Sequence, residues 1–420
     1  MGRKIKIGYL KVLPESNLIS AMVIENNFIN LLGRYADIKI IPINKGRIEE
    51  DFKRVKRYSI DYLYVTSFNL LQIPFFLREK LKMDIPFIFY IHAVFPWYRN
   101  FIHIIPFLRE YDRIFAPSKY AKNLFLKLSS KFIVRVVPHC VDFKTIQGNL
   151  STNPEKNNKI ITYMGRMTEE KGVGALIESF PKIMAKIGNA RLNLIGPLSG
   201  QGMKNYPKSR YVKQLEELVR RRRLTNRVTF KGIQLSLDKY RILSGSDIFV
   251  NPTLAKEETF GMVNIEALAC GVPVVATDWA GNREIIENDK NGYLLKVNRW
   301  GDNQHFDNGQ MASKIIMVLS DKDLNARLKK NATASAKKYD YRIIMPRLVG
   351  SLKKRRHKAA VRGRWDYFKD KAPCDFVDSF NNEFLFYLFY INEFRNETYS
   401  SLYNKAINKY TAKNGRYETI

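Results

Sequence analysis

The sequence has no long hydrophobic run. A helix that spans a bilayer needs about 20 mostly apolar residues, and the longest apolar stretches, residues 85–98 and 384–391, are shorter. Residues 1–13 alternate charged and apolar side chains as a strand does, and they lack the apolar core of a secretory signal peptide. We therefore expect no membrane-spanning segment and a protein that stays in the cytoplasm.

Cysteine, histidine and acidic residues are also scarce. The three cysteines, Cys140, Cys270 and Cys374, lie far apart, which argues against a disulfide framework and favours buried, inert thiols in a reducing compartment. The five histidines are scattered, so no metal-ligand cluster is indicated. Only 40 acidic residues stand against 71 basic ones, which gives a formal net charge of +31. Two interpretations of this charge are open: an anionic partner, whether nucleic acid, anionic lipid or a phosphorylated substrate, or a general compositional bias towards lysine and isoleucine.

What the sequence does contain is an alternation of apolar runs and helical segments. A chain of 420 residues favours two or more domains. In residues 1–148, apolar runs such as 62–66 and 87–91 are typical of strands buried on both faces of a sheet. The alternation returns in residues 159–340, after a polar linker at 149–158. These features predict an α/β protein with two domains, each a parallel sheet covered by helices.

Some helix limits can be predicted from capping residues and periodicity. Ser118 is placed to cap a helix that runs on through Lys127. The last helices of the second domain are expected at residues 303–320 and 323–338.

Residues 257–273 carry the motif that is most informative about function. Two carboxylates, Glu258 and Glu266, lie eight residues apart. Between them come the residues of a tight turn and a helix start: Phe260, Gly261, Met262 and Val263. Gly261 lets the backbone approach a ligand closely, and the first N–H groups of a helix form a seat for phosphate. Glu266 should lie about one turn into the helix, with Glu258 on the loop before it.

A second motif follows the strand expected at residues 159–164. Gly165 and Arg166 come directly after the strand, and Lys171 follows five residues later. An arginine fork and a lysine ammonium in one loop can converge on a single diphosphate. Neither a GxGxxG fingerprint nor a Walker loop is present, so the chain lacks the common phosphate-binding motifs.

Together these two motifs resemble those of the retaining nucleotide-sugar glycosyltransferases of family 4. The resemblance covers residues 1–355 and is strongest over 160–295. It implies a GT-B fold, with two Rossmann-like, doubly wound domains and a cleft between them, and a helix at 341–358 that crosses back to the first domain. It also implies a hexosyltransferase that moves a sugar from a nucleotide diphosphate donor to an acceptor with retention of configuration.

The same resemblance assigns roles to individual residues. Arg166 and Lys171 would hold the donor diphosphate, Glu266 the ribose, and Glu258 the hydroxyls of the sugar. His92, at the end of an expected strand, would contact the sugar from the other domain. Backbone groups around the turn and at two further loops would complete the donor site: Gly165, Ile233, Gln234 and residues 260–263. Two departures from the family pattern are His139 and Cys140, in the turn that leaves the first domain.

We expect neither a cofactor nor a metal. No DxD-type carboxylate pair is placed near this site. The charge of the leaving diphosphate would then be met by Arg166, Lys171 and the helix dipole.

The acceptor is less clearly indicated. The aromatic and aliphatic stretch at residues 95–109, flanked by arginines, is typical of a helix in a membrane interface, and also of one packed on a core. With the basic cluster at residues 53–57, it suggests a peripheral protein on the inner membrane surface that acts on a lipid-linked acceptor or glycan. Residues 359–420 are rich in aromatics and could cover the first domain, dimerise or touch membrane.

Other functions remain open at this point. The net charge, with clusters at residues 53–57 and 353–358, would suit a protein that binds or modifies nucleic acid. These clusters lie outside the expected cleft and lack interleaved aromatics, which disfavours nucleic acid as the partner. A sugar epimerase or a phosphorylase on the same fold is the alternative within the enzymes.

Overall fold

A computed structural model shows how the elements are arranged. It describes residues 3–13, 19–44, 48–65, 83–91, 111–127, 133–151, 157–199, 208–255, 258–300 and 303–353. The chain divides into two compact units. The first consists of Met1–Ser16, Leu32–Val137 and Pro346–Ile420, and the second of Asn17–Leu31 and Pro138–Met345.

The first unit is built on a six-stranded sheet in the order β2-β1-β3-β4-β5-β6, in which every pair is parallel. Its strands are β1 (Lys6–Leu13), β2 (Asp37–Asn44), β3 (Tyr62–Val65), β4 (Phe87–Tyr90), β5 (Arg113–Ala116) and β6 (Val134–Val136). All residues of β3, β4 and β5 are buried, as expected for strands covered on both faces.

Two helices described around this sheet are α2 (Ile48–Val55) and α4 (Lys119–Leu126). Helix α1 (Ile19–Gly33) belongs to the second unit up to Leu31. The side chain of Ser118 accepts a hydrogen bond of 2.9 Å from the Ala121 amide, so the predicted N-cap of α4 is confirmed. Within the described residues no helix is both long and apolar enough to cross a bilayer.

The second unit is built on another six-stranded parallel sheet, in the order β12-β11-β10-β7-β8-β9. The strands are β7 (Lys159–Met164), β8 (Ala190–Ile195), β9 (Val228–Gly232), β10 (Ile248–Asn251), β11 (Val274–Thr277) and β12 (Gly292–Leu295). The main helices are α6 (Val173–Lys186), α7 (Arg210–Arg221), α8 (Ser236–Ser244), α9 (Met262–Ala269), α10 (Asn308–Ser320) and α11 (Lys322–Ala336).

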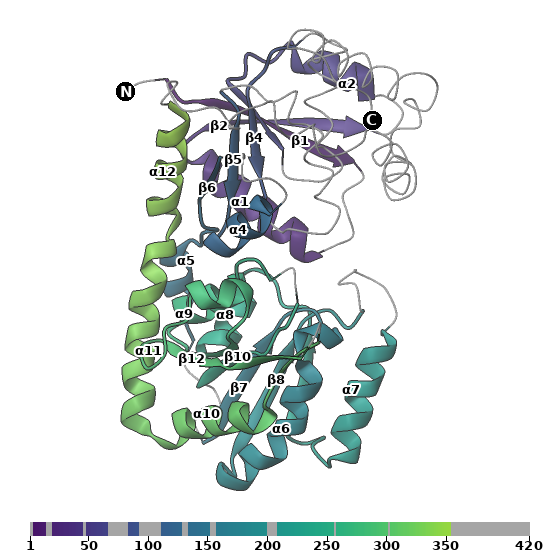
Figure 1. Ribbon diagram of the computed structural model, residues 1–420, viewed down its shortest axis with the longest axis vertical. Coiled ribbons are helices and arrows are strands. Elements are labelled where there is room, and N and C mark those ends of the chain that lie inside the picture. Colours follow the sequence, from purple (N-terminus) through teal and green to yellow (C-terminus); the bar gives the residue numbers. More distant parts are fainter. Residues whose placement is uncertain are drawn as a thin grey trace. The chain divides into compact units, whose positions relative to one another are not determined.

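Alternate residues of one strand enter two different cores on the two faces of this sheet. On β10, Ile248 and Val250 pack with residues of α6 and α10, whereas Phe249 packs with residues of α9. Figure 1 shows α6 and α10 on one side of the sheet and α8 and α9 on the other. Both sheets therefore have the Rossmann-like α/β layout that the sequence predicted, which confirms the fold class.

One prediction about the helices is wrong in part. Residues 303–306 do not open a helix but form β14 (Asn303–Phe306), antiparallel to β13 (Val297–Trp300). The helix begins at Asn308 because the Asp307 carboxylate accepts a hydrogen bond of 2.7 Å from the Gly309 amide and caps its N-terminus.

Shorter elements complete the second unit: α5 (Phe143–Gln147) and the 3-10 turns η4 (Glu169–Lys171), η5 (Ala280–Glu284) and η6 (Lys337–Tyr339). Helix α12 (Tyr341–Lys353) begins in the second unit and continues in the first from Pro346. The domain limits expected at residues 148, 159, 340 and 358 stay predictions. The tail at 359–420 lies outside the described residues.

Candidate functional site

The strand order of the second unit singles out one place for a ligand. The chain runs outward in one direction from β7 to β8 and β9, and in the other from β10 to β11 and β12, so β7 and β10 flank the switch point. Ligands of open α/β sheets bind beyond the carboxyl ends of the strands at such a point. The Arg166 loop follows β7, and the loop that carries Glu258 follows β10. The two sequence motifs are therefore brought to the same edge of the sheet.

The loop after β7 is held tightly against the loop after β10. Gly172 has a positive φ of 71°, and a Cβ atom there would lie 2.3 Å from the carbonyl oxygen of Pro252. The Leu254 amide donates a hydrogen bond of 2.7 Å to the Glu170 carbonyl. Only glycine fits this approach, which fixes where the preceding residue, Lys171, leaves the backbone.

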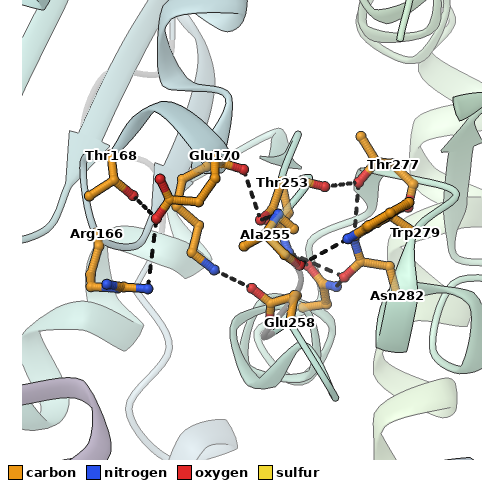
Figure 2. A network of polar contacts seen from close by, with 12 residues as sticks. Arg166, Thr168, Glu170, Thr253, Ala255, Glu258, Thr277, Trp279 and Asn282 are labelled. Atoms are coloured by element: carbon orange, nitrogen blue, oxygen red, sulfur yellow. Dashed lines mark hydrogen bonds and ion pairs between the residues drawn. The ribbon is translucent and has the colours of Figure 1, made fainter. Parts of the chain in front are cut away.

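Lys171 and Glu258 form an ion pair that joins the two loops, with 2.5 Å between Nζ and Oε2. Their side chains are only 14% and 15% exposed, so the pair is largely shielded from water. Arg166 makes a longer ion pair, 3.9 Å from Glu170, and remains about one third exposed. Figure 2 shows Arg166 and Glu258 on either side of the loop that carries Glu170.

The backbone around Glu258 is anchored on both sides. Its amide donates to the Ala255 carbonyl over 3.2 Å, and its carbonyl accepts from the Gly281 amide over 3.0 Å. The Trp279 indole N–H donates to the Ala255 carbonyl over 2.9 Å (Figure 2). These bonds place the carboxylate on a fixed loop rather than on a free surface segment.

The turn before α9 is supported by three buried amides. Gly261 has a φ of 92°, and a Cβ atom there would lie 2.9 Å from Nδ2 of Asn264. That same Nδ2 donates to Oδ1 of Asn282 over 2.7 Å, and Asn251 donates to Oδ1 of Asn264 over 3.0 Å. The packed amides hold the glycine turn and the helix start at Met262, whose first N–H groups suit an anion.

A cavity of the second unit brings together most of the residues predicted to bind the donor. Six of them line it: Gly165, Arg166, Ile233, Met262, Val263 and Glu266. Gln234 also lines it, and its side-chain amide donates to the Lys231 carbonyl over 2.8 Å. Glu266 lies on the second turn of α9 and Glu258 on the loop before it, as expected.

Phe260 has a different place from the other turn residues. The residue is only 5% exposed and belongs to the core cluster that contains residues of α9. It contacts the rings of His139 and Tyr339 edge to face, with centroids 5.2 Å and 5.9 Å away. The part of Phe260 left for a ligand is therefore its backbone, while its side chain supports the turn.

The turn at His139 and Cys140 is buried, and both residues line the same cavity. Burial, with a smaller contribution from Asp340, raises the pKa of the Cys140 thiol to about 12. Cys270 is also free and buried, and burial raises the pKa of its thiol. Both cysteines are free and buried, as the sequence analysis predicted, and the raised pKa values favour the protonated thiol at neutral pH. Cys374 lies outside the described residues.

Sequence reasoning missed one residue of this cavity, Lys239 of α8. Its ammonium lies 2.5 Å from Oε1 of Glu266, and its side chain is 11% exposed. A lysine on an amphipathic helix usually faces solvent, so only a partner 27 residues away reveals its place.

Other parts of the predicted site cannot be located. His92 and residues 95–109 lie outside the described residues. In the part of the chain that the structure describes, no three His, Cys, Asp or Glu side chains gather where they could hold a metal ion. Independence from metal stays a prediction.

Comparison with known proteins agrees with this geometry. Residues 149–335 match the family described as "Glycosyl transferases group 1". The chain is 33% identical over 142 residues to an uncharacterized glycosyltransferase of Methanocaldococcus jannaschii, covering 34% of this chain and 33% of that protein. It is 28% identical over 180 residues to N-acetyl-alpha-D-glucosaminyl L-malate synthase of Bacillus anthracis, covering 43% and 41%. The matched stretch spans less than half the length of these relatives.

Among solved structures, HepE of Anabaena in complex with UDP-glucose aligns with a TM-score of 0.65 at 18% identity. The alignment covers 83% of this chain and 99% of that one, and it shows the likeness of fold. With its two parallel six-stranded sheets the chain has the GT-B fold, and its second sheet lies within the residues that match the model of the glycosyl transferases group 1.

Proposed function

We propose that the protein is a hexosyltransferase that moves a sugar from a nucleoside diphosphate donor to an acceptor with retention of configuration. The observation that carries the proposal is the ion pair of Lys171 and Glu258 at the switch point of the second sheet. It lies in the same loops as Arg166 and the glycine turn of α9. The family domain over residues 149–335 and the UDP-glucose complex of a protein of similar fold support a nucleotide-sugar donor.

The diphosphate end of the site would carry the chemistry of the leaving group. In the transfer, the bond between the anomeric carbon and the diphosphate oxygen breaks, and the diphosphate leaves with the electron pair. The acceptor hydroxyl oxygen forms the new bond to the anomeric carbon, and its proton passes to an oxygen of the leaving diphosphate. Arg166, Lys171 and the first N–H groups of α9 would stabilise the negative charge that develops on the diphosphate.

The two glutamates would divide the remaining recognition. Glu266 lines the cavity and would accept hydrogen bonds from the ribose, while Glu258 would orient the sugar through its hydroxyls. Lys171 already holds the Glu258 carboxylate, so an incoming phosphate would share this ammonium or displace the carboxylate from it. Backbone groups at Ile233 and Gln234 would contact the base, and His92 the sugar. No metal is required in this scheme.

For the acceptor we propose a lipid-linked glycan at the inner face of the membrane. The support is the basic cluster at residues 53–57, of which Lys53, Lys56 and Arg57 are exposed, and the aromatic stretch at residues 95–109. Each basic residue near an anionic surface contributes about 1 kcal/mol.

The donor site is tested by removing its cations one at a time. In Arg166→Ala and Lys171→Ala, sugar transfer or donor hydrolysis should fall on the order of 100- to 1000-fold, because a positioned charge no longer meets the leaving group. Lys182→Ala, on the exposed face of α6, is the control and should turn over normally. Normal turnover in both site variants would refute the phosphate assignment, and an inverted product anomer in NMR would refute retention.

A further inference from the structure

The cavity contains a buried cation that the donor scheme does not use. Lys239 of α8 is paired with Glu266 of α9, at 2.5 Å between Nζ and Oε1, and the two side chains are 11% and 8% exposed. Both residues line the cavity together with Gly196 and Gln234. This pair belongs to the nucleoside end of the cavity, because Glu266 is the residue proposed to meet the ribose.

The ammonium has a second contact besides the carboxylate. Nζ lies 4.9 Å from the centroid of the Tyr240 ring, a distance at which a cation is attracted to an aromatic face. Burial raises the pKa of the Tyr240 hydroxyl, and the neighbouring Glu266 charge is the next cause. The lysine, the tyrosine and the glutamate thus form one compact polar group between α8 and α9.

Stability alone gives little reason for such a pair. Desolvation of two charges offsets most of their attraction, and buried ion pairs can often be replaced by apolar side chains at no cost. A carboxylate that must accept hydrogen bonds from a ligand is a different case, because its oxygens have to be held in one orientation. A carboxylate offers about four lone-pair positions, and the contact with Nζ uses one of them.

We infer that Lys239 is a positioning residue of the nucleoside subsite, whose ammonium holds the Glu266 carboxylate in the orientation that accepts hydrogen bonds from the ribose hydroxyls. The inference rests on the proposed donor site. It implies that Lys239 acts through Glu266 and makes no contact with the ligand itself.

The test compares nucleotides with and without ribose hydroxyls. Calorimetry with the full chain would measure Kd for UDP and GDP and for their 2′,3′-dideoxy counterparts. For whichever base binds, the wild type should prefer the ribonucleotide about 10- to 100-fold, as hydrogen bonds to a charged group would give. In Lys239→Met this preference should fall at least about fivefold, while the affinity for the dideoxynucleotide stays within about twofold. Lys239→Arg keeps the cation and should keep most of the preference.

Matched variants separate the outcomes. Arg241→Met removes a cation from the same helix that pairs on the surface with Asp238, and it should behave as the wild type. If Lys239→Met does not fold, Lys239→Gln takes its place with the same expectation. Equal losses for both nucleotides, or an unchanged preference, would overturn the role of Lys239. If the preference for the ribonucleotide is lost in Glu266→Gln but kept in Lys239→Met, the role of Lys239 is wrong while the proposed donor site stands. If Glu266→Gln keeps the preference for the ribonucleotide, or if no nucleotide binds the wild type, both the role of Lys239 and the proposed function are wrong.

Discussion

Lys171 and Glu258 carry opposite charges, and in the proposed function they would meet different parts of one substrate. In the structure each compensates the other in a place that is about 85% shielded from water. Removing one member of a shielded pair leaves the other charge uncompensated. Glu258 is paired with a lysine proposed to bind phosphate, whereas Glu266 is paired with Lys239, which the donor scheme does not use. The two glutamates should therefore respond differently to the loss of their charge.

Glu266→Gln should weaken the binding of a free nucleoside diphosphate about 10- to 100-fold, because the ribose loses a charged acceptor. Glu258→Gln should lower sugar transfer but leave the affinity for the free nucleotide unchanged or slightly improved, because it frees the Lys171 ammonium for phosphate. Calorimetry with the nucleotide and a transfer assay measure the two effects. Glu287→Gln, an exposed carboxylate paired with Lys290, is the control. Equal losses of nucleotide affinity in Glu258→Gln and Glu266→Gln would refute this division.

For single residues, the sequence predicted the position in the fold of those that belong to a short local motif. Arg166, Lys171 and the two glutamates stand at strand ends and helix starts, where a short motif specifies their place. Lys239 could not be found in this way, since its partner lies on another helix and its own surroundings read as an ordinary amphipathic surface. Phe260 shows the opposite limit, because the motif predicted the position but not that the ring would turn into the core.

Among the elements, the loop from β7 to α6 depends on a single glycine. Gly172 is the left-handed cap between η4 and α6, in direct approach to Pro252. The position of Lys171 is thus fixed by backbone geometry and not by side-chain packing.

Gly172→Ala should destabilise the protein by about 1–3 kcal/mol, the usual cost of a strained backbone conformation, because its Cβ would meet the Pro252 carbonyl. It should also slow transfer at least tenfold, since Lys171 would move from the diphosphate. Urea unfolding and transfer kinetics measure both effects. Gly188→Ala is the matched control, because nothing lies within 4 Å of its Cβ position. Wild-type stability and turnover in Gly172→Ala would contradict the account.

Helices and strands were predicted best where a continuous apolar run or a capping residue marks them. The buried strands of both sheets were recognised by their apolar runs, and the start of α4 by the Ser118 cap. The hairpin of β13 and β14 was missed because residues 297–306 lack a regular apolar alternation. The helix after it was placed five residues too early, although Asp307 offers a standard capping signal.

For the whole molecule, the order of the strands explains why two distant motifs form one site. Parallel strands on either side of a switch point direct their following loops to the same edge, so residues 87 positions apart meet. The alternation of strands and helices predicted this class of sheet, while the exact strand order came only from the structure. The net charge of +31 is also a property of the whole molecule, and it favours attraction to an anionic surface.

The net positive charge predicts binding to anionic membranes. The protein should co-sediment with anionic vesicles at low salt and less at high salt, because exposed charges are screened. A folded Trp97→Ser, Phe101→Ser variant should bind more weakly still, since it loses the apolar contribution. Neutral vesicles are the control. No binding to anionic vesicles at low salt would remove the case for a peripheral location.

The central claim, a nucleoside diphosphate site at the β7 and β10 loops, is tested most directly by thermal unfolding with ligand. UDP, GDP, ADP, CDP and TDP would be added to the wild type, to Lys182→Ala and to an Arg166→Ala, Lys171→Ala double variant. A ligand at about 100 times its Kd stabilises the folded state by about 2.7 kcal/mol, so at least one nucleotide should raise the Tm of the wild type and of Lys182→Ala. The account predicts that this rise is lost in the double variant. No rise with any of the nucleotides, or an equal rise in the double variant, would contradict it.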